Sequence, residues 1–136
     1  MLAYVDTSIW ILYVEGLPDY QNAVETRLEQ LKQEGWCFCA SQAVMMETLY
    51  KPYRENNPGL TTVYIDLFKK TKNLYNYTEL FEDGLRIMQS ETLKAMDSLH
   101  VALAAHYGCE RFITTDADFR NLQTVPVLLI DLLHAS

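Results

Sequence analysis

Cysteine, long apolar runs and positive charge are all scarce in this sequence. The three cysteines are an odd number with no framework or metal-binding spacing, which argues against a disulfide scaffold and against a zinc site. No apolar stretch reaches the roughly 20 residues that span a membrane, and no basic segment precedes an apolar run at the N-terminus. We therefore expect a cytoplasmic protein that does not associate with membranes.

The shortage of positive charge limits how this chain could bind a nucleic acid. It has 11 Lys and Arg against 18 Asp and Glu, a formal net charge of −7. Proteins that bind nucleic acid by charge alone usually show the opposite balance, because Lys and Arg must neutralise phosphates. A bound divalent cation could supply the missing attraction. The negative charge is equally compatible with simple solubility or with a basic protein partner.

Length and apolar content indicate one domain over residues 1–136, since 49% of the residues are hydrophobic. Short apolar strands are expected at Leu2–Val5, Trp36–Ala40, Leu74–Tyr77, Arg111–Thr114 and Val125–Ile130. Helical patterns lie between them, over 9–14, 19–34, 42–54, 60–72, 78–90 and 94–107, with Ser41 and Thr78 as N-caps. This alternation predicts an α/β fold with a central parallel sheet of four or five strands and helices on both faces.

Acidic residues fall where such a sheet places its ligand, beyond the carboxyl ends of the strands. Asp6 follows the first strand directly, and Asp116 and Asp118 follow the strand at Arg111–Thr114. Each also has an ordinary interpretation: Asp6 could be a helix cap, and Asp116 and Asp118 could be turn residues. The hydroxyls or backbone N–H groups of Thr7, Ser8, Thr114 and Thr115, next to these acids, could bind phosphate.

Two further acids lie in apolar helical segments. Glu47 has no obvious Lys or Arg partner nearby in sequence, and Asp97 could alternatively cap its helix. A carboxylate is rarely buried without a partner, and crowded carboxylates raise one another's pKa values. A divalent cation resolves that conflict, and oxygen ligands suit Mg²⁺ or Mn²⁺. His100, one turn after Asp97, could be a general acid, although a packed histidine is the favoured interpretation.

Four short motifs occur in an order that resembles PIN-domain ribonucleases, in particular the toxin components of bacterial toxin–antitoxin pairs (VapC-like). They cover nearly the whole chain: Tyr4-Val5-Asp6-Thr7-Ser8, Met46-Glu47-Thr48, Asp97-Ser98-Leu99-His100-Val101-Ala102-Leu103-Ala104 and Ile113-Thr114-Thr115-Asp116-Ala117-Asp118-Phe119. The resemblance implies a three-layer PIN-like fold and an Mg²⁺- or Mn²⁺-dependent endoribonuclease acting on single-stranded or structured RNA. It also implies a small antitoxin protein as partner and allows a homodimer.

The resemblance assigns the catalytic acids by position. Asp6, Glu47, Asp97 and Asp116 would form the metal-binding cluster, and Asp118 matches a position where the family often has a further acid. We expect Asp6 and Asp97 to be the primary metal ligands. Asp116 would bind a second metal or act through water, and Glu47 would orient the attacking water. Thr7, Ser8 and Thr115 are the expected phosphate contacts.

Two other classes of protein compete with a nuclease. The chain could be a catalytically silent PIN-fold module that binds a protein partner or RNA. A phosphotransfer enzyme or receiver domain also places an Asp after a strand. A haloacid-dehalogenase-like phosphatase, however, needs an acid where Ser8 stands, and a receiver domain needs a Lys after a late strand, where none follows Ile130. Both phosphotransfer classes are therefore disfavoured.

Overall fold

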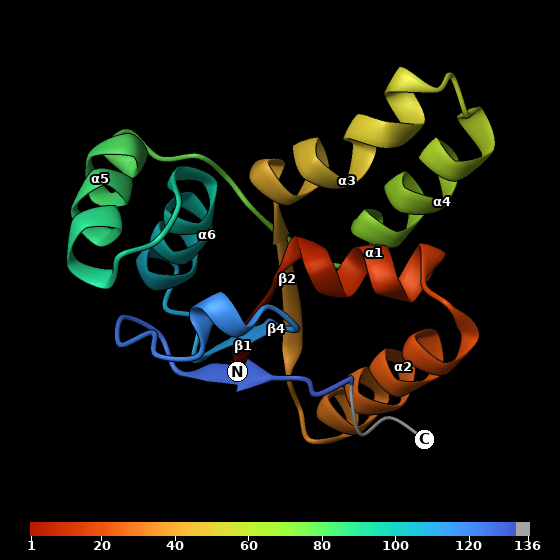
Figure 1. The fold of residues 1–136 in the computed structure, drawn as a ribbon, viewed down its shortest axis with the longest axis horizontal. Helices are drawn as coiled ribbons and strands as arrows, with labels where there is room; N and C mark the ends of the chain where they lie inside the picture. Colours follow the sequence, from red (N-terminus) through yellow and green to blue (C-terminus); the bar gives the residue numbers. More distant parts are fainter. Residues whose placement is uncertain (133–136) are drawn as a thin grey trace.

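A parallel sheet forms the centre of the computed structural model, which describes residues 1–132 (Figure 1). The five strands are β1 (Leu2–Val5), β2 (Cys37–Ser41), β3 (Lys72–Leu74), β4 (Arg111–Thr114) and β5 (Val127–Leu129). They lie in the order β3-β2-β1-β4-β5, and every neighbouring pair is parallel. In β1, the central strand, Tyr4 pairs with Cys39 on one side and with Phe112 on the other.

Helices cover both faces of the sheet, as the sequence predicts. The α-helices are α1 (Thr7–Glu15), α2 (Pro18–Gln33), α3 (Gln42–Arg54), α4 (Pro58–Lys69), α5 (Leu80–Glu91) and α6 (Ala95–His106), and a 3-10 helix, η1, spans Ala117–Phe119. In Figure 1, α1 to α4 lie on one side of the strands and the α5–α6 pair on the other. The predicted α/β fold with a parallel sheet between two helical layers is confirmed.

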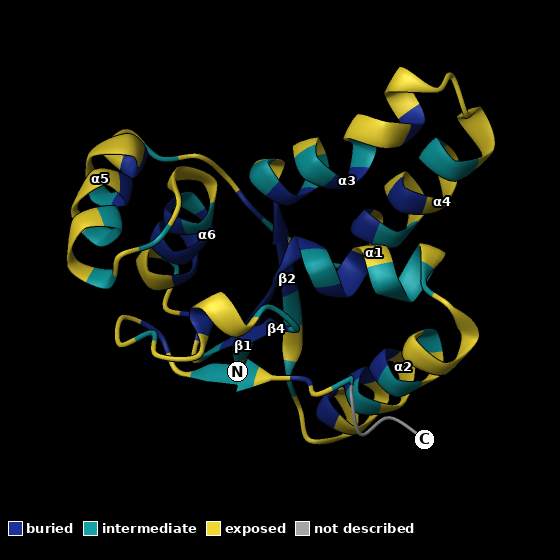
Figure 2. Cartoon of the chain, viewed as in Figure 1, coloured by how far each residue is buried: buried dark blue, intermediate teal, exposed yellow. Residues whose placement is uncertain are grey.

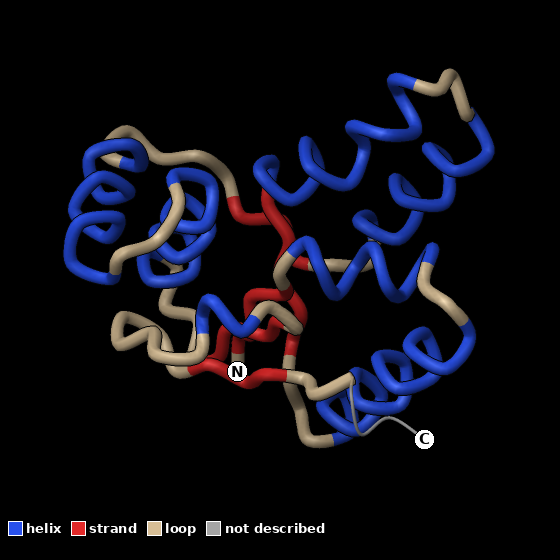
Figure 3. Tube along the Cα trace, in the orientation of Figure 1, coloured by secondary structure: helices blue, strands red, loops and turns tan. Residues whose placement is uncertain are grey.

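The strand order explains where a ligand could bind. The chain moves outward from β1 to β2 and β3, then returns through α5 and α6 to place β4 on the other side of β1 (Figure 3). The order therefore reverses between β1 and β4. In open parallel sheets this switch point leaves a crevice beyond the carboxyl ends of the two strands. The residues that follow Val5 and Thr114 lie at this switch point.

The core is formed by the strands and the helix faces turned towards them (Figure 2). Along β1, Ala3, Tyr4 and Val5 have no exposed surface. A continuous apolar run of this kind is expected for a parallel strand that is covered on both faces. On the other face, a Cβ at Gly84 of α5 would lie 2.9 Å from Cδ2 of Leu99, so a larger residue there would require the Leu99 side chain of α6 to shift.

The boundaries of β3 and α5 differ from the sequence prediction. We expected a strand at Leu74–Tyr77, but the strand ends at Leu74 and Tyr75 is 71% exposed. The β-favouring tyrosines belong to the connection to α5, because only Leu74 is buried against the sheet. Thr78 is not the N-cap of the next helix: that position is Glu79, and it makes no side-chain cap hydrogen bond.

The predicted cap of α3 is confirmed, since Oγ of Ser41 accepts from the backbone N–H of Val44 at 3.2 Å. Pro52 lies inside α3, and the helix continues past it to Arg54. In β2, Cys39 is buried and Cys37 is exposed at the start of the strand. Within residues 1–132, no helix is both long enough and apolar enough to cross a membrane.

Candidate active site

Asp6 lies at the end of β1 and is held by three hydrogen bonds. Its Oδ1 accepts from the backbone N–H of Thr7 at 2.8 Å, and its Oδ2 accepts from the hydroxyls of Ser8 at 3.1 Å and Thr114 at 2.8 Å. It is therefore the N-cap of α1, so the capping interpretation is correct. Asp6 is only 6% exposed, and burial raises the pKa of its carboxyl group despite these donors.

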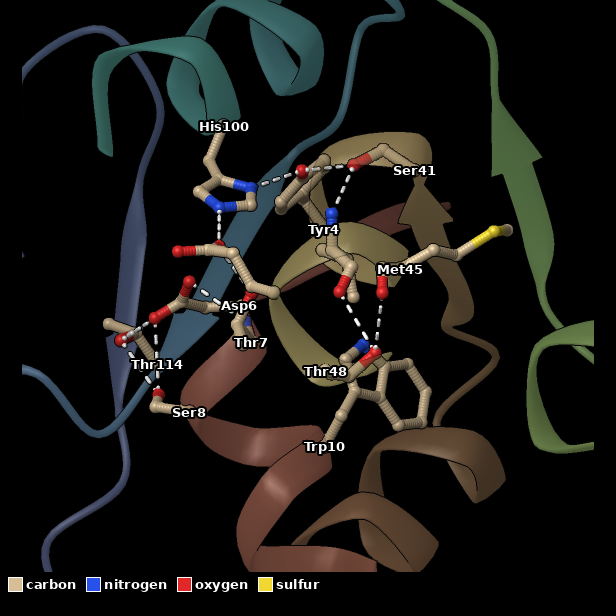
Figure 4. A network of polar contacts seen from close by, with 12 residues as sticks. Tyr4, Asp6, Thr7, Ser8, Trp10, Ser41, Met45, Thr48, His100 and Thr114 are labelled. Atoms are coloured by element: carbon tan, nitrogen blue, oxygen red, sulfur yellow. Dashed lines mark hydrogen bonds and ion pairs between the residues drawn. The ribbon is translucent and has the colours of Figure 1, made fainter. Parts of the chain in front are cut away.

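Glu47 lies in α3 and is partnered by a histidine that is distant in sequence. Its Oε1 accepts from Thr7 Oγ1 at 2.7 Å and from Nε2 of His100, 53 residues later (Figure 4). Burial acts to raise the pKa of Glu47, but the hydrogen bond and charge of His100 outweigh it and the pKa is lowered. His100 itself is 1% exposed, so the interpretation as a packed histidine is confirmed.

Asp97 lies in the first turn of α6, within electrostatic range of the other acids. It does not cap this helix, because the N-cap position is Lys94. Burial raises the pKa of Asp97, and the negative charges of Asp6, Asp116 and Glu47 raise it further. Carboxylates from β1, α3, α6 and the loop after β4 thus lie within electrostatic range of one another.

Asp116 and Asp118 form a turn after β4. Asp116 accepts from the backbone N–H of Asp118 at 2.9 Å, and its own N–H donates to Thr114 Oγ1 at 3.0 Å. Asp118 is exposed, and this backbone bond is its contribution to the turn. The turn interpretation is therefore correct for both, and the charge of Asp116 also acts on Asp97. A catalytic role for Asp118 stays a prediction.

The predicted phosphate contacts are used within the protein to hold the acids. Thr7 donates its hydroxyl to Glu47, and Ser8 donates its hydroxyl to Asp6. The backbone N–H of Thr115 donates to Ser8 Oγ at 3.3 Å. These groups fix the carboxylates in place, and phosphate binding by Thr7, Ser8 and Thr115 stays a prediction.

A buried polar chain behind Glu47 was missed by the sequence analysis. Nδ1 of His100 lies 2.6 Å from the hydroxyl of Tyr4, which lies 2.8 Å from Oγ of Ser41 (Figure 4). All three side chains are at most 1% exposed. A tyrosine inside an otherwise aliphatic strand is the signal that could have indicated this chain, because a buried phenol hydroxyl needs a partner.

The carboxylates have the donor chemistry of an Mg²⁺ or Mn²⁺ site. Asp97 accepts no side-chain hydrogen bond from residues 1–132, and neither does Oε2 of Glu47. Mg²⁺ keeps several waters and often binds through one or two carboxylates, which this arrangement provides. A complete ligand set is not preformed: within the described chain, no three His, Cys, Asp or Glu side chains are grouped closely enough to hold a metal ion.

The parallel sheet with acids at its switch point defines an α/β protein, and comparison with known families places it in one of them. The sequence profile of the PIN domain matches residues 3–125. This match covers most of the chain, which therefore belongs to the PIN domain family. A comparison with curated proteins finds no match.

Solved structures with this fold share little sequence with the chain. One is a chain of VapBC2 from Rickettsia felis, in a crystal structure with a promoter DNA fragment. It superposes on this chain with a TM-score of 0.73 and 14% sequence identity, and the match covers 96% of this chain and 100% of that one. A chain of a toxin–antitoxin complex from Klebsiella pneumoniae has a TM-score of 0.70 and 18% identity, and the match covers 95% of this chain and 98% of that one. A chain of FitAcB from Neisseria gonorrhoeae has a TM-score of 0.65 and 14% identity, and the match covers 97% of this chain and 99% of that one.

Proposed function

We propose that residues 1–136 act as one domain, an endoribonuclease that hydrolyses RNA phosphodiester bonds with the help of Mg²⁺ or Mn²⁺. The observation that carries this proposal is the position of Asp97. Its half-buried carboxylate accepts no hydrogen bond from residues 1–132, and the negative charges of Asp6, Asp116 and Glu47 act on it. Without a cation this crowding of like charges is unfavourable, and a divalent cation bound by Asp97 would relieve it. PIN domains are in general nucleases, and this chain belongs to that family.

The proposed roles follow from how each acid is held. Asp6 and Asp97 would bind the ion, which when present makes a bound water acidic and offsets charge on the phosphate. Asp116 would bind a second ion or act through water. Glu47, fixed by Thr7 and His100, orients the water that attacks phosphorus. Family resemblance implies products with 5′-phosphate and 3′-hydroxyl ends.

We also propose that the nuclease is the toxin of a toxin–antitoxin pair, with a small antitoxin protein as its partner and with homodimerisation. The support is the fold shared with chains of two complexes, one named VapBC2 and the other described as a toxin–antitoxin complex. Co-expression with the product of an adjacent small gene, followed by co-purification, tests the partner. RNA remains the proposed substrate whether or not the chain is toxic.

Substitution of Asp97 by Asn tests the nuclease. The wild-type protein should cut single-stranded RNA with Mn²⁺, and EDTA should abolish the cutting. Asp97→Asn keeps the shape and removes the charge, so we expect cleavage to fall at least about 100-fold, as losing a metal ligand or its partner does. The matched control is Asp66→Asn, since Asp66 is an exposed acid of α4 that forms an ion pair with Lys69. Undiminished cutting by Asp97→Asn would exclude this site.

One observation favours a second candidate, a catalytically silent PIN module that binds a protein partner or RNA. The oxygens of Asp6 and Oε1 of Glu47 already accept protein donors, and no three-residue ligand group is preformed in residues 1–132. Calorimetry with Mn²⁺ separates the two: heat of binding that is lost in Asp97→Asn supports the nuclease. No binding by the wild-type protein supports the silent module.

A further inference from the structure

We propose that Tyr4 and His100 are positioning residues that hold the Glu47 carboxylate in its working orientation, through a buried chain of hydrogen bonds that begins at Ser41. The chain runs from Ser41 to Tyr4, from Tyr4 to His100 and from His100 to Glu47 (Figure 4). This inference rests on the proposed nuclease, because it gives Glu47 a role in catalysis.

The burial of the chain shows that it acts through Glu47 and not on RNA. Tyr4 has no exposed surface and His100 is 1% exposed, so neither side chain reaches solvent. The side chain of Glu47 is 34% exposed, so Glu47 is the member of the hydrogen-bond chain that solvent can reach. Tyr4 and His100 therefore cannot contact substrate, and any effect they have on turnover must pass through Glu47.

The hydrogen bonds of the chain are continuous from Ser41 to Glu47. An ionised Glu47 can only accept, so Nε2 of His100 donates to it. Nδ1 of His100 lies 2.6 Å from the Tyr4 hydroxyl, which lies 2.8 Å from Oγ of Ser41, and a hydroxyl can donate or accept in each of these contacts. Oγ of Ser41 also accepts from the backbone N–H of Val44. Each buried polar side chain between Ser41 and Glu47 therefore has a partner on both sides.

The rigidity of its anchors makes this chain suited to positioning. Tyr4 lies in the central strand and its ring stacks on Phe112, with centroids 5.4 Å apart and planes 6° apart. Ser41 is both the end of β2 and the cap of α3, the helix that carries Glu47. The Glu47 carboxylate is therefore fixed through its own helix, by the hydroxyl of Thr7 and by a histidine on α6. A surface glutamate on a helix has only the first of these.

Kinetics of Tyr4→Phe provide the first test, because the substitution removes one hydroxyl and leaves the ring. We expect kcat for RNA cleavage with Mn²⁺ to fall about 10- to 100-fold, the usual cost of removing a partner behind a catalytic ligand, with KM unchanged. The matched control is Tyr64→Phe. Tyr64 is also fully buried and donates to a carboxylate, Glu15 at 2.5 Å, but in contact with α1 and away from the acids. It should leave kcat unchanged.

Nitrogen-15 NMR of the His100 ring in the metal-free protein provides the second test and does not depend on activity. In the wild-type protein Nε2 should carry a proton that it donates to Glu47. Tyr4→Phe should shift the resonances of the ring nitrogens, and Tyr64→Phe should shift neither. An unprotonated Nε2 in the wild type, unchanged resonances in Tyr4→Phe, or equal kcat in Tyr4→Phe and wild type would overturn the proposal. If the wild type cuts no RNA, the nuclease proposal fails by itself, and the NMR result still decides whether the chain holds Glu47 as assigned.

Discussion

Two carboxylates in this molecule show opposite electrostatic behaviour, Glu91 at the end of α5 and Asp97 at the start of α6. Glu91 accepts from the backbone N–H of Gln123 at 2.9 Å and from both the N–H and the hydroxyl of Thr124 at 2.7 and 2.6 Å. Burial acts to raise its pKa, but these hydrogen bonds outweigh it and the pKa is lowered. The pKa of Asp97, which has like charges around it and no donor of this kind, is raised.

The difference separates a structural acid from a candidate functional one. Glu91 ties α5 to the segment before β5 and stabilises the fold in its charged form. Burial disfavours the charged form of Asp97, and the negative charges of Asp6, Asp116 and Glu47 disfavour it further. Groups whose local environment disfavours the state they must hold are typical of functional sites. Substitutions that change donors or charge at each position can test this contrast.

The largest expected effect comes from substitution of Thr114. Its hydroxyl donates a hydrogen bond to the carboxylate of Asp6, as the hydroxyl of Thr124 does to Glu91. The same hydroxyl accepts from the N–H of Asp116, and the side chain is fully buried. Thr114→Val keeps the shape but leaves both groups short of a partner, so the free energy of unfolding should fall by about 2 kcal/mol. Urea denaturation measures this.

A control for this substitution is Thr62→Val on the exposed face of α4, which should change stability by no more than about 0.5 kcal/mol. Equal stability of Thr114→Val and wild type would mean that the hydrogen bond from Thr114 to Asp6 does not stabilise the folded protein.

The next effect in size is the loss of the Glu91 contacts. Glu91→Ala should lower the free energy of unfolding by about 1 kcal/mol at pH 7, a value reduced for the partial exposure of the carboxylate. Because the folded pKa lies below the unfolded one, this stabilisation is complete above the ordinary glutamate pKa and is lost as pH falls through the folded value. Unfolding measured from pH 7 downward should show the two proteins converging.

The exposed Glu29 of α2 serves as the control, since Glu29→Ala should stay within about 0.5 kcal/mol of wild type at every pH. A Glu91→Ala deficit that persisted unchanged in acid would show that lost packing, and not the charged hydrogen bonds, causes it.

The acids of the candidate site also show what the sequence can and cannot predict. Asp6 and Asp116 could be placed at the same edge because each follows an apolar strand, and parallel strands bring their carboxyl ends together. The partner of Glu47 could not be predicted, since His100 is 53 residues away and only the packing of α6 on the sheet brings it near. The shift of β3 to Lys72–Leu74 was missed because tyrosine propensity does not reveal burial.

The smallest expected effect is also the most specific, a gain in stability when Asp97 loses its charge. Asp97→Asn should raise the free energy of unfolding of the metal-free protein by a few tenths of a kcal/mol to about 1, because solvent screens the half-exposed carboxylate. The folded pKa of Asp97 is raised, so the charged form costs stability above that pKa, and the cost disappears as pH falls below the ordinary aspartate value. The gap between variant and wild type should therefore close in acid, as it does for Glu91→Ala but with the opposite sign.

Mn²⁺ should reverse the order of the two proteins. An ion that binds only the folded state stabilises it according to its concentration and affinity, so the wild type should gain Tm with added Mn²⁺. Asp97→Asn, without a proposed ligand, should gain little. If Mn²⁺ raised the Tm of both proteins equally, Asp97 would not bind the ion, and its raised pKa would reflect crowding alone. A wild type that is less stable than the variant without Mn²⁺ and more stable with it would show that the repulsion among the acids is relieved by the metal.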